Sequence, residues 1–492
     1  MSLPRTEPEI STLLMPNLRL FHTEDLQRIH QAALEILERV GMLVNHSEAM
    51  QLLEAAEAKV DFQRHRVWFP PDLVEAKLRL VPKRVEYHGR TPEFDFICEP
   101  NGDIYAQVGG GSTGYIDLAS GQYRRACLAD LREFSILGDA LPNTHVAAAL
   151  FCEDTPEANT DLYCLQTLLE SQRLPISTNA FSLGNLRKMI EMLLVVQGSR
   201  QELEKGPLMH LELSPISPLA LMEDEASQLF LACEYNIPVL FPVMPNAGVT
   251  GPITLAGTLA QALAEWLGMV TLTQLARPGL PIPFFIDPVV ADMHSMAVQF
   301  AAPEAGLLMA GLAQLGKELY GLAPQGNGLC TDGFSYPQTL FQKAQNALLL
   351  GLAGGKMMIG SGEVEGVVSC DPVQLVIDDE IMAITRRLLR PIAVNEDTLA
   401  LDEIERVGPG GQFLDSDHTL RHHRSGELMR AKLFEHGSRN SWLADGSKTL
   451  VERAREKAGK ILASHQVPPL ADEVTDELHA ILRKADEECD LV

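Results

Sequence analysis

The sequence is poor in cysteine and in basic charge. Its eight cysteines include no Cys-x-x-Cys pair and lie scattered through apolar segments. This indicates small core residues in a reducing compartment rather than a disulfide framework. Lys and Arg total 40 against 66 Asp and Glu, which gives a formal charge of −26 at pH 7. That balance argues against a nucleic-acid backbone or an anionic membrane surface as partner.

Long hydrophobic runs and an export signal are also missing. Gly, Pro or a charged residue interrupts every apolar stretch before it reaches the about 20 residues of a membrane span. The N-terminus, Met-Ser-Leu-Pro-Arg-Thr-Glu-Pro-Glu, has no basic region followed by an apolar stretch. No secretory signal is therefore predicted, and we expect a cytoplasmic protein with no membrane partner.

Several catalytic motifs are absent as well. No Gly-x-Ser-x-Gly elbow follows an apolar run, and the Gly-rich segments 109–114 and 408–411 lack the Lys-Ser/Thr ending of a P-loop. Asp292-Met-His294 is interpreted as a cap, and His418, His422 and His423 as a solvated basic face. We predict no metal site and no side-chain nucleophile.

What the sequence does contain is an alternation of short apolar runs and amphipathic helices. Eight runs separated mostly by helical stretches predict a parallel sheet, and the lack of an N-terminal nucleotide fingerprint favours closure into a barrel. We predict an α/β fold, a (β/α)8 TIM-type barrel over 101–370, with helical extensions over 1–100 and 371–492. The eight runs are Ile104–Val108, Val146–Cys152, Pro175–Phe181, Leu208–Leu213, Val239–Met244, Pro281–Asp287, Gly321–Gly328 and Lys356–Gly360.

Polar residues near the ends of these runs are the candidate site residues. Active sites of such barrels lie at the carboxyl ends of the strands, where residues two apart share a face. A polar side chain inside an apolar strand is costly unless it is paired or faces a wet cavity. These residues either touch a ligand or bond the loops, and the sequence leaves both possibilities open. They form four pairs, Asn179 with Phe181, His210 with Glu212, Phe285 with Asp287, and Gln325 with Asn327.

Two loops carry further candidates. The turn after the fifth run, Pro245 to Gly257, is expected to start a helix near Thr250 or Gly251 and to offer free backbone N–H groups. The loop after the seventh run carries Phe334 and Tyr336, and an aromatic wall at an acidic mouth suits a quaternary ammonium.

Several spaced motifs give the chain its resemblance to a known family. It resembles the trimethylamine methyltransferase family, and within it the members without pyrrolysine, which include glycine betaine:corrinoid methyltransferases. In pyrrolysine-containing relatives the special residue follows the seventh strand, where this chain has ordinary residues from Phe334 to Pro337. The motifs are Ile36–Gly41, Gly248–Gly257, Gln274–Gly279, Leu375–Glu380, Val407–Gly411 and His418–Leu420.

The resemblance implies a (β/α)8 barrel that moves a methyl group to the Co(I) corrinoid of a partner protein. The ordinary residues after the seventh run favour a quaternary amine as donor, glycine betaine first, with dimethylglycine as product. No cofactor is expected to be tightly bound, no residue of this chain is expected to be catalytic, and a homo-oligomer is expected. Positioning and exclusion of water are then the contribution of the protein.

Residue roles follow from that expectation. Phe285, Phe334 and Tyr336 are expected to contact the trimethylammonium group, with the pocket shaped by Gln325, Asn327, His210, Glu212, Asn179 and Phe181. The carboxylate of a betaine is expected to meet the N–H groups of Gly248, Thr250 and Gly251, or His210. Two other functions stay open: a metal-dependent hydrolase or lyase using Asp287, Asp292 and His294, and a non-catalytic quaternary-ammonium binding protein.

Overall fold

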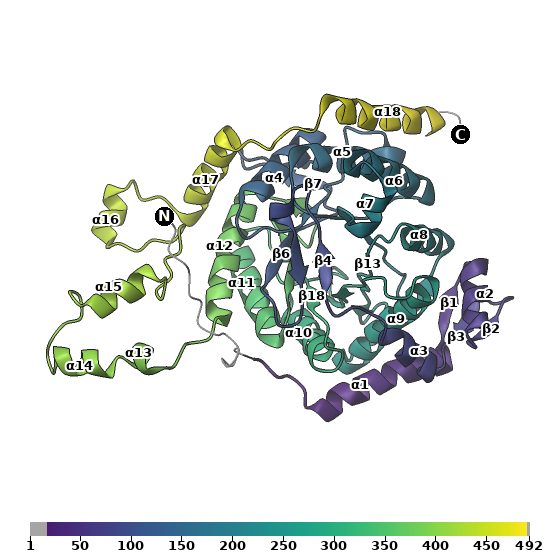
Figure 1. Cartoon of the computed structure of the whole chain (residues 1–492), viewed down its shortest axis with the longest axis horizontal. Helices are drawn as coiled ribbons and strands as arrows, with labels where there is room; N and C mark the ends of the chain where they lie inside the picture. Colours follow the sequence, from purple (N-terminus) through teal and green to yellow (C-terminus); the bar gives the residue numbers. More distant parts are fainter. Residues whose placement is uncertain (1–16, 490–492) are drawn as a thin grey trace.

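The computed structural model describes residues 17–489 and shows a ring of short strands inside a ring of helices (Figure 1). Each of the eight predicted runs contains one strand, and the predicted α/β class is confirmed. The strands are β6 (Tyr105–Val108), β9 (Ala147–Ala148), β10 (Ile176–Thr178), β11 (Met209–Glu212), β13 (Val239–Leu240), β15 (Phe284–Phe285), β18 (Pro324–Gly326) and β19 (Met357–Ser361).

These strands pair in parallel in two four-stranded sheets, ordered β13-β11-β10-β9 and β15-β18-β19-β6. Single parallel bridges join the sheets at both edges, Gln107 with Val146 and Val243 with Ile286. All carboxyl ends therefore point to one end of the ring, which we call the mouth. Around the strands run α4 (Leu128–Ala140), α5 (Thr160–Ser171), α6 (Leu183–Gln197), α8 (Glu223–Glu234), α9 (Leu255–Ala276), α10 (Pro303–Glu318), α11 (Tyr336–Ala353) and α12 (Pro372–Leu389).

Helix α9 is long and apolar enough to cross a membrane by length and composition. Within the protein, however, 83% of its most apolar window is buried, and it packs against α1 (Thr23–Glu35), α3 (Pro71–Leu78) and α10. Its apolar character on all sides is typical of a core helix.

The N-terminal region is not only helical, which corrects the prediction for residues 1–100. Besides α1, α2 (Ser47–Ala55) and α3, it forms β1 (Met42–Val44), β2 (Lys59–Asp61) and β3 (Arg66–Trp68), with β1 also pairing with β12 (Ala220–Leu221). A hairpin of β4 (Val85–Tyr87) and β5 (Phe96–Cys98) packs against residues of the strands such as Phe285, Met357 and Ile359. The three-residue strands are too short for alternation to reveal them in the sequence.

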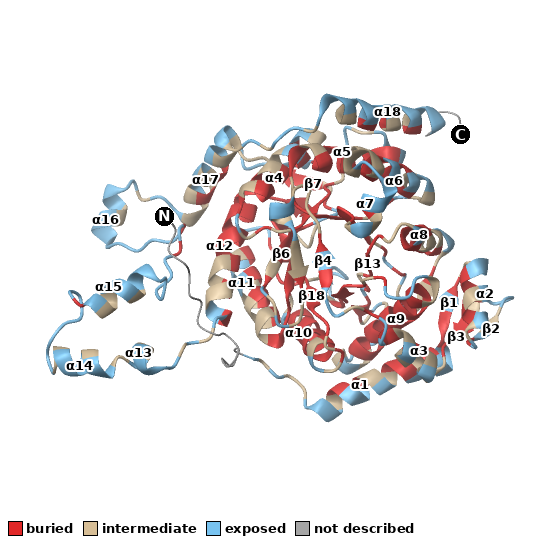
Figure 2. Ribbon diagram, in the orientation of Figure 1, coloured by how far each residue is buried: buried red, intermediate tan, exposed pale blue. Residues whose placement is uncertain are grey.

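The C-terminal region is helical, as the sequence predicts. Helix α17 (Leu450–Ser464) packs against α12 and α4, and α18 (Asp472–Cys489) packs against α6 and α5. Between α12 and α17 the chain leaves the body in a long excursion with α13 (Glu396–Leu399), α14 (Leu401–Val407), α15 (Asp417–Arg424) and α16 (Arg439–Ala444), most of it exposed (Figure 2).

Candidate functional site

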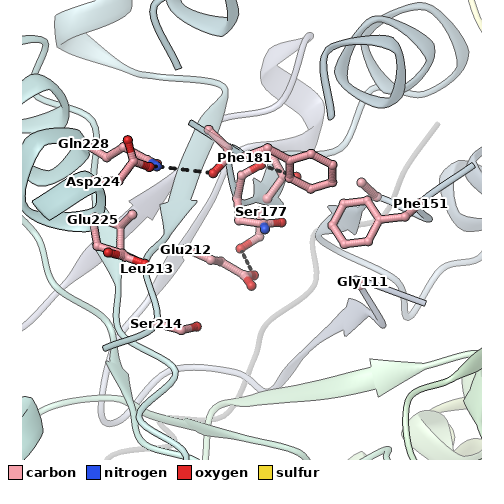
Figure 3. Close-up of a pocket in the computed structure, with 15 residues that line it drawn as sticks. Gly111, Phe151, Ser177, Phe181, Glu212, Leu213, Ser214, Asp224, Glu225 and Gln228 are labelled. Atoms are coloured by element: carbon pink, nitrogen blue, oxygen red, sulfur yellow. Dashed lines mark hydrogen bonds between the residues drawn. The ribbon is translucent and has the colours of Figure 1, made fainter. Parts of the chain in front are cut away.

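A cavity of about 330 Å3 opens at the mouth, between the ends of β10 and β11 and the start of α8 (Figure 3). Strand ends and loops supply its walls, because a parallel strand exposes its last residues and the following loop at the carboxyl end. The cavity includes Asn179, Phe181 and Glu212 among the predicted residues. It also includes Phe151, Ser177, Asp224 and Glu225.

One wall of the cavity is aromatic. The rings of Phe151 and Phe181 meet edge to face, with centroids 4.9 Å apart. Both residues follow parallel strands, Phe151 after β9 and Phe181 after β10, and Figure 3 shows their rings together at one side of the cavity. The faces of such rings carry partial negative charge, so this wall suits a cationic methylated nitrogen.

Glu212, the last residue of β11, forms the polar floor. Its Oε1 accepts hydrogen bonds from Ser177 Oγ at 2.6 Å and from Gln107 Nε2 at 3.2 Å. Burial raises the pKa of this carboxyl, and the two donors oppose the shift. A cation in the cavity would favour the ionised form of Glu212 by Coulomb attraction.

Two more carboxyls lie at the first turn of α8. Asp224 accepts from Gln228 Nε2 at 2.6 Å and from the backbone N–H of Leu183 at 3.1 Å. Glu225 keeps one buried oxygen, Oε2, without a hydrogen-bond partner in the described structure. The cavity wall thus contains three carboxyl side chains, and its lining residues include no Lys, Arg or His.

Two further buried carboxyl groups lie at the mouth, after other strands than those that line this cavity. Asp287, two residues after β15, accepts a hydrogen bond from Asn327, and burial raises its pKa to about 7. Glu363 follows β19 and lies 3.4 Å from Ser112 Oγ, with its pKa also raised by burial to about 7. The negative charge of Glu212 also raises the pKa of Glu363, so the two carboxyl groups interact electrostatically.

Glu363 is held in place by a fully buried ion pair. Lys343 Nζ lies 2.7 Å from Asp378 Oδ2, and neither side chain is accessible to solvent. Lys343 also donates to the carbonyl of Gly360, and Asp378 accepts from the N–H of Gly362, so the pair fixes the turn before Glu363. On the other side, a Cβ at Gly109 would lie 1.9 Å from Glu363 Cγ, which leaves room only for glycine.

Three predicted residues lie deeper in the strand ring than the cavity. Phe285 packs with the β4–β5 hairpin, and Gln325 Nε2 donates to the hydroxyl of Tyr87 at 2.8 Å. His210 packs on the same Tyr87 ring with centroids 4.2 Å apart, and burial lowers its pKa to about 3. His210 is therefore neutral at physiological pH, and the roles assigned to these three residues stay predictions.

The two aromatic residues after the seventh strand are not among the residues that line the cavity. Phe334 is 82% exposed. Tyr336 begins α11, and its hydroxyl donates to Asp371 Oδ2 at 2.8 Å. Contact of either ring with a substrate stays a prediction.

The turn after the fifth strand differs in detail from the prediction. Helix α9 begins at Leu255 rather than near Thr250 or Gly251. The N–H groups of Gly248, Thr250 and Gly251 all donate to backbone carbonyls within the turn. They are not free donors in this conformation, so binding of a carboxylate there stays a prediction that requires the turn to open.

The residues of the metal-dependent alternative do not gather at one place. Asp292 lies on the exposed tip of the hairpin formed by β16 (Val289–Ala291) and β17 (Val298–Gln299), where it caps the N–H groups of His294 and Ser295 at 2.8 Å. Asp287 is instead buried and bonded to Asn327. Among residues 17–489, the one cluster with three potential metal ligands is Asp397, His418 and His422, far along the chain in the C-terminal region.

Sequence reasoning missed several residues of the site. Asp224 and Glu225 look in the sequence like ordinary acidic residues of the first turn of a helix. Phe151 looks like an ordinary core residue. Gln107 and Ser177 lie within predicted apolar runs, and their signal is the one that the selected residues share, a polar side chain inside an apolar run.

The raised pKa of Asp287 predicts a stability effect. Because the folded protein holds this proton more tightly than the unfolded chain, its stability falls as pH rises from about 4 through the folded pKa of about 7. Asp287→Asn should remove a penalty of at most roughly 4 kcal/mol at pH 8 and much less at pH 5. Melting temperatures at both pH values measure this, with exposed Asp292→Asn as control, and an equal shift at both values would contradict it.

Fold and cavity together define an α/β protein with an acidic and aromatic cavity at its strand ends. Residues 5–489 match the family described as trimethylamine methyltransferase (MTTB). The chain belongs to this family, and its general activity is that of a methyltransferase. The family resemblance inferred from the sequence motifs is thereby confirmed.

Relatives match almost end to end. The trimethylamine methyltransferase MttB of Desulfitobacterium hafniense is 28% identical over 479 residues, covering 95% of this chain and 94% of the relative. A glycine betaine methyltransferase of the same species is 25% identical, covering 96% and 98%. The monomethylamine methyltransferase MtmB of Methanosarcina barkeri has a similar fold, with a TM-score of 0.50 and 12% identity over 90% of this chain and 94% of that one.

Proposed function

We propose that this protein transfers a methyl group from a quaternary amine to the Co(I) corrinoid of a partner protein, releasing a tertiary amine. The donor enters the mouth of a closed (β/α)8 barrel and occupies the cavity between Phe181 and Glu212. Glycine betaine is the first candidate donor, with dimethylglycine as product, and its carboxylate is expected to point away from the acidic lining of this cavity. The protein acts in the cytoplasm.

The observation that carries this proposal is the chemistry of the cavity. Its lining combines the Phe151–Phe181 pair with the carboxyls of Glu212, Asp224 and Glu225, and includes no basic side chain. Aromatic faces and carboxylates both stabilise a quaternary ammonium, while a neutral amine of the same shape gains little from either. Family membership supplies the methyl-transfer chemistry.

The reaction requires no side chain of this protein to form a covalent bond with the substrate. The nucleophile is the Co(I) centre of the corrinoid, which takes the methyl group while the C–N electron pair stays on nitrogen. A quaternary nitrogen therefore leaves as a neutral tertiary amine without a proton donor. The side chains of this protein hold the nitrogen, aim one methyl out of the cavity and exclude water.

Positive charge leaves the nitrogen as the methyl group moves. A full ion pair with Glu212 therefore stabilises the bound substrate more than the transition state. Contact with Phe151 and Phe181 is weaker, so its loss during the transfer raises the activation barrier less. The raised pKa of Glu212 moderates this effect, because burial weakens the charged form. A carboxyl with a raised pKa beside an aromatic wall therefore binds the cation without stabilising the bound substrate so strongly that methyl transfer becomes slow.

A panel of donors tests the proposal. Glycine betaine, proline betaine, carnitine, choline, tetramethylammonium and trimethylamine are each incubated with the protein and Co(I) cobalamin. We expect methylation of the cobalamin with at least one quaternary amine, and the demethylated tertiary amine by mass spectrometry. Methylation by trimethylamine alone would contradict the quaternary class, and a bound divalent metal required for turnover would favour the hydrolase or lyase alternative.

The aromatic wall gives a separate prediction. Phe181→Ala should weaken binding of the preferred quaternary amine about fivefold, since a cation–π contact contributes about 1 kcal/mol at such a site. Phe181→Leu retains apolar volume but loses the ring face, so its effect should be nearly as large. Calorimetry measures both, and unchanged affinity in the two variants would exclude Phe181 from the substrate site.

The alternative of a non-catalytic quaternary-ammonium binding protein is disfavoured by membership of a methyltransferase family. The same cavity would support it, because binding requires the cation contacts and not the partner. The donor panel separates the two functions: binding of a quaternary amine without methyl transfer to Co(I) cobalamin would favour the binding protein.

A further inference from the structure

Two short helices of the excursion between α12 and α17 bring one carboxylate and two imidazoles together. Asp397 lies in the first turn of α13, and His418 and His422 lie on α15. Residues four apart share one face of a helix, so both imidazoles lie on the same side of α15. Their ring centroids are 4.2 Å apart. One potential ligand atom from each of the three residues lies within 4.8 Å of the other two.

The contact between Asp397 and His422 has the spacing of two metal ligands. Asp397 Oδ2 lies 3.2 Å from His422 Nε2. This nitrogen is shielded from solvent, yet it has no hydrogen-bond partner in the described structure. In a tetrahedral zinc site, ligand atoms that bind at about 2.0–2.2 Å are about 3.4 Å apart, which is close to the observed separation. A bound cation would satisfy the nitrogen that the protein leaves without a partner.

Neighbouring groups hold the carboxylate and the second imidazole in position. The other oxygen of Asp397, Oδ1, accepts a hydrogen bond from Arg421 at 2.7 Å, which leaves Oδ2 to bind a metal. His418 Nε2 donates to the backbone carbonyl of Asp397 at 3.1 Å, so this ring stays beside α13. Hydrogen bonds from the groups around a metal site fix the orientation of its ligands in the same way.

A further carboxylate lies beside the cluster. Arg406, with smaller contributions from Ser416 and His418, lowers the pKa of Glu403 on α14 to about 2. Glu403 is therefore ionised at neutral pH, and its charge is close enough to His418 for the two groups to interact. A second negative charge at this place favours a bound cation.

We propose that Asp397, His418 and His422 bind a zinc ion that joins α13 to α15. Two imidazole nitrogens and one carboxylate oxygen are ligands that zinc takes in tetrahedral sites, and water or Glu403 completes the fourth position. Calcium and magnesium take oxygen ligands, so the two histidines argue against both. His418 and His422 are then ligands, in place of the solvated basic face and the absence of a metal expected from the sequence.

Zinc at this place stabilises a part of the chain that has no core of its own. Among residues 391–429, Ser416 is the one buried residue, and Figure 1 shows α13, α14 and α15 beyond the helix ring. Helices α13 and α15 have 4 and 8 residues, and isolated helices shorter than about 12 residues are marginal in water. Because metal binding adds its free energy to folding, the ion opposes local unfolding of this segment.

Calorimetry with zinc chloride on the full chain tests the proposal. After treatment with a chelator and dialysis, the wild type should bind one equivalent of zinc. His422→Ala should weaken this binding by more than about 100-fold, because removal of a group that only supports a ligand already costs about 10- to 100-fold. Magnesium at millimolar concentration should not compete. Zinc binding is measured without donor or cobalamin, so its result is separate from that of the donor panel.

The matched control is His423→Ala. His423 is the next residue on α15, is exposed and is not part of the cluster, so its replacement should leave the affinity for zinc unchanged. Zinc should also slow proteolysis within residues 391–429 of the wild type and of His423→Ala, but not of His422→Ala. A wild type that binds no zinc would overturn the proposal, as would wild-type affinity in His422→Ala or an equal loss of affinity in the two variants.

Discussion

Glu212→Gln should raise the KM for the preferred quaternary amine roughly 30-fold while kcat increases. The substitution keeps the acceptor for Ser177 and Gln107 but removes the negative charge at the cavity floor. Loss of a partly desolvated ion pair costs about 2 kcal/mol of binding, which corresponds to that factor. Since the substrate loses its charge during transfer, the transition state loses less than the ground state.

The matched control for this variant is Glu265→Gln. Glu265 on α9 is also buried, has a raised pKa, and accepts from a serine and a glutamine, Ser217 at 2.6 Å and Gln261 at 2.8 Å. It lies outside the cavity, so its neutralisation should leave KM unchanged. A neutral carbon isostere of the donor should bind both variants like the wild type. Equal loss of affinity for cation and isostere in Glu212→Gln would contradict a charge-based role.

We expect the affinity for the cationic substrate to depend on pH. Asp287 and Glu363 have pKa values raised by burial to about 7, and the pKa of Glu212 is also raised. The ionised carboxyls attract the cation, so affinity should rise with pH toward 8 and fall below about pH 7. Glu363→Gln should flatten the lower part of this profile.

Lys343→Met should destabilise the protein by about 3–5 kcal/mol. The substitution leaves Asp378 as a buried carboxylate without its ammonium partner, 2.7 Å away in the wild type. Because the pair also fixes the turn before Glu363, activity of the folded fraction should fall as well. Chemical denaturation measures the first effect, and steady-state kinetics at a temperature where the variant is folded measures the second.

Two further variants separate charge burial from a general loss of packing. Lys343→Met combined with Asp378→Asn should be more stable than Lys343→Met alone, since no unpaired charge remains. Arg200→Met breaks the exposed pair with Glu204 and should cost less than about 1 kcal/mol. A double variant no more stable than the single one would show that packing and not charge dominates at this position.

The order of strands and helices could be predicted because the apolar residues of one sequence recur with the period of a strand or of a helix over long stretches. Seven of the eight strands lie within the predicted runs, and β19 extends one residue beyond its run, to Ser361. The β4–β5 hairpin could not be predicted, because Val85–Tyr87 and Phe96–Cys98 are too short for a periodic signal.

The site was partly predictable for a related reason. Asn179, Phe181 and Glu212 could be singled out because polar and aromatic residues at strand ends differ from an apolar background, and they line the cavity, while their contact with a substrate stays a prediction. Phe285, Gln325 and His210 share that pattern but face the hairpin, whose position depends on contacts distant in sequence. Asp224 and Glu225 enter the cavity because α8 begins beside β11, a relation set by tertiary packing.

One measurement tests the central claim most directly. The protein is mixed with Co(I) cobalamin and glycine betaine, and the loss of Co(I), the gain of methylcobalamin and the amount of dimethylglycine are followed together. The account predicts one methylcobalamin and one dimethylglycine for each Co(I) consumed, with a rate that falls in Glu212→Gln at low substrate. Absence of methyl transfer from this donor and from every other quaternary amine of the panel would contradict it.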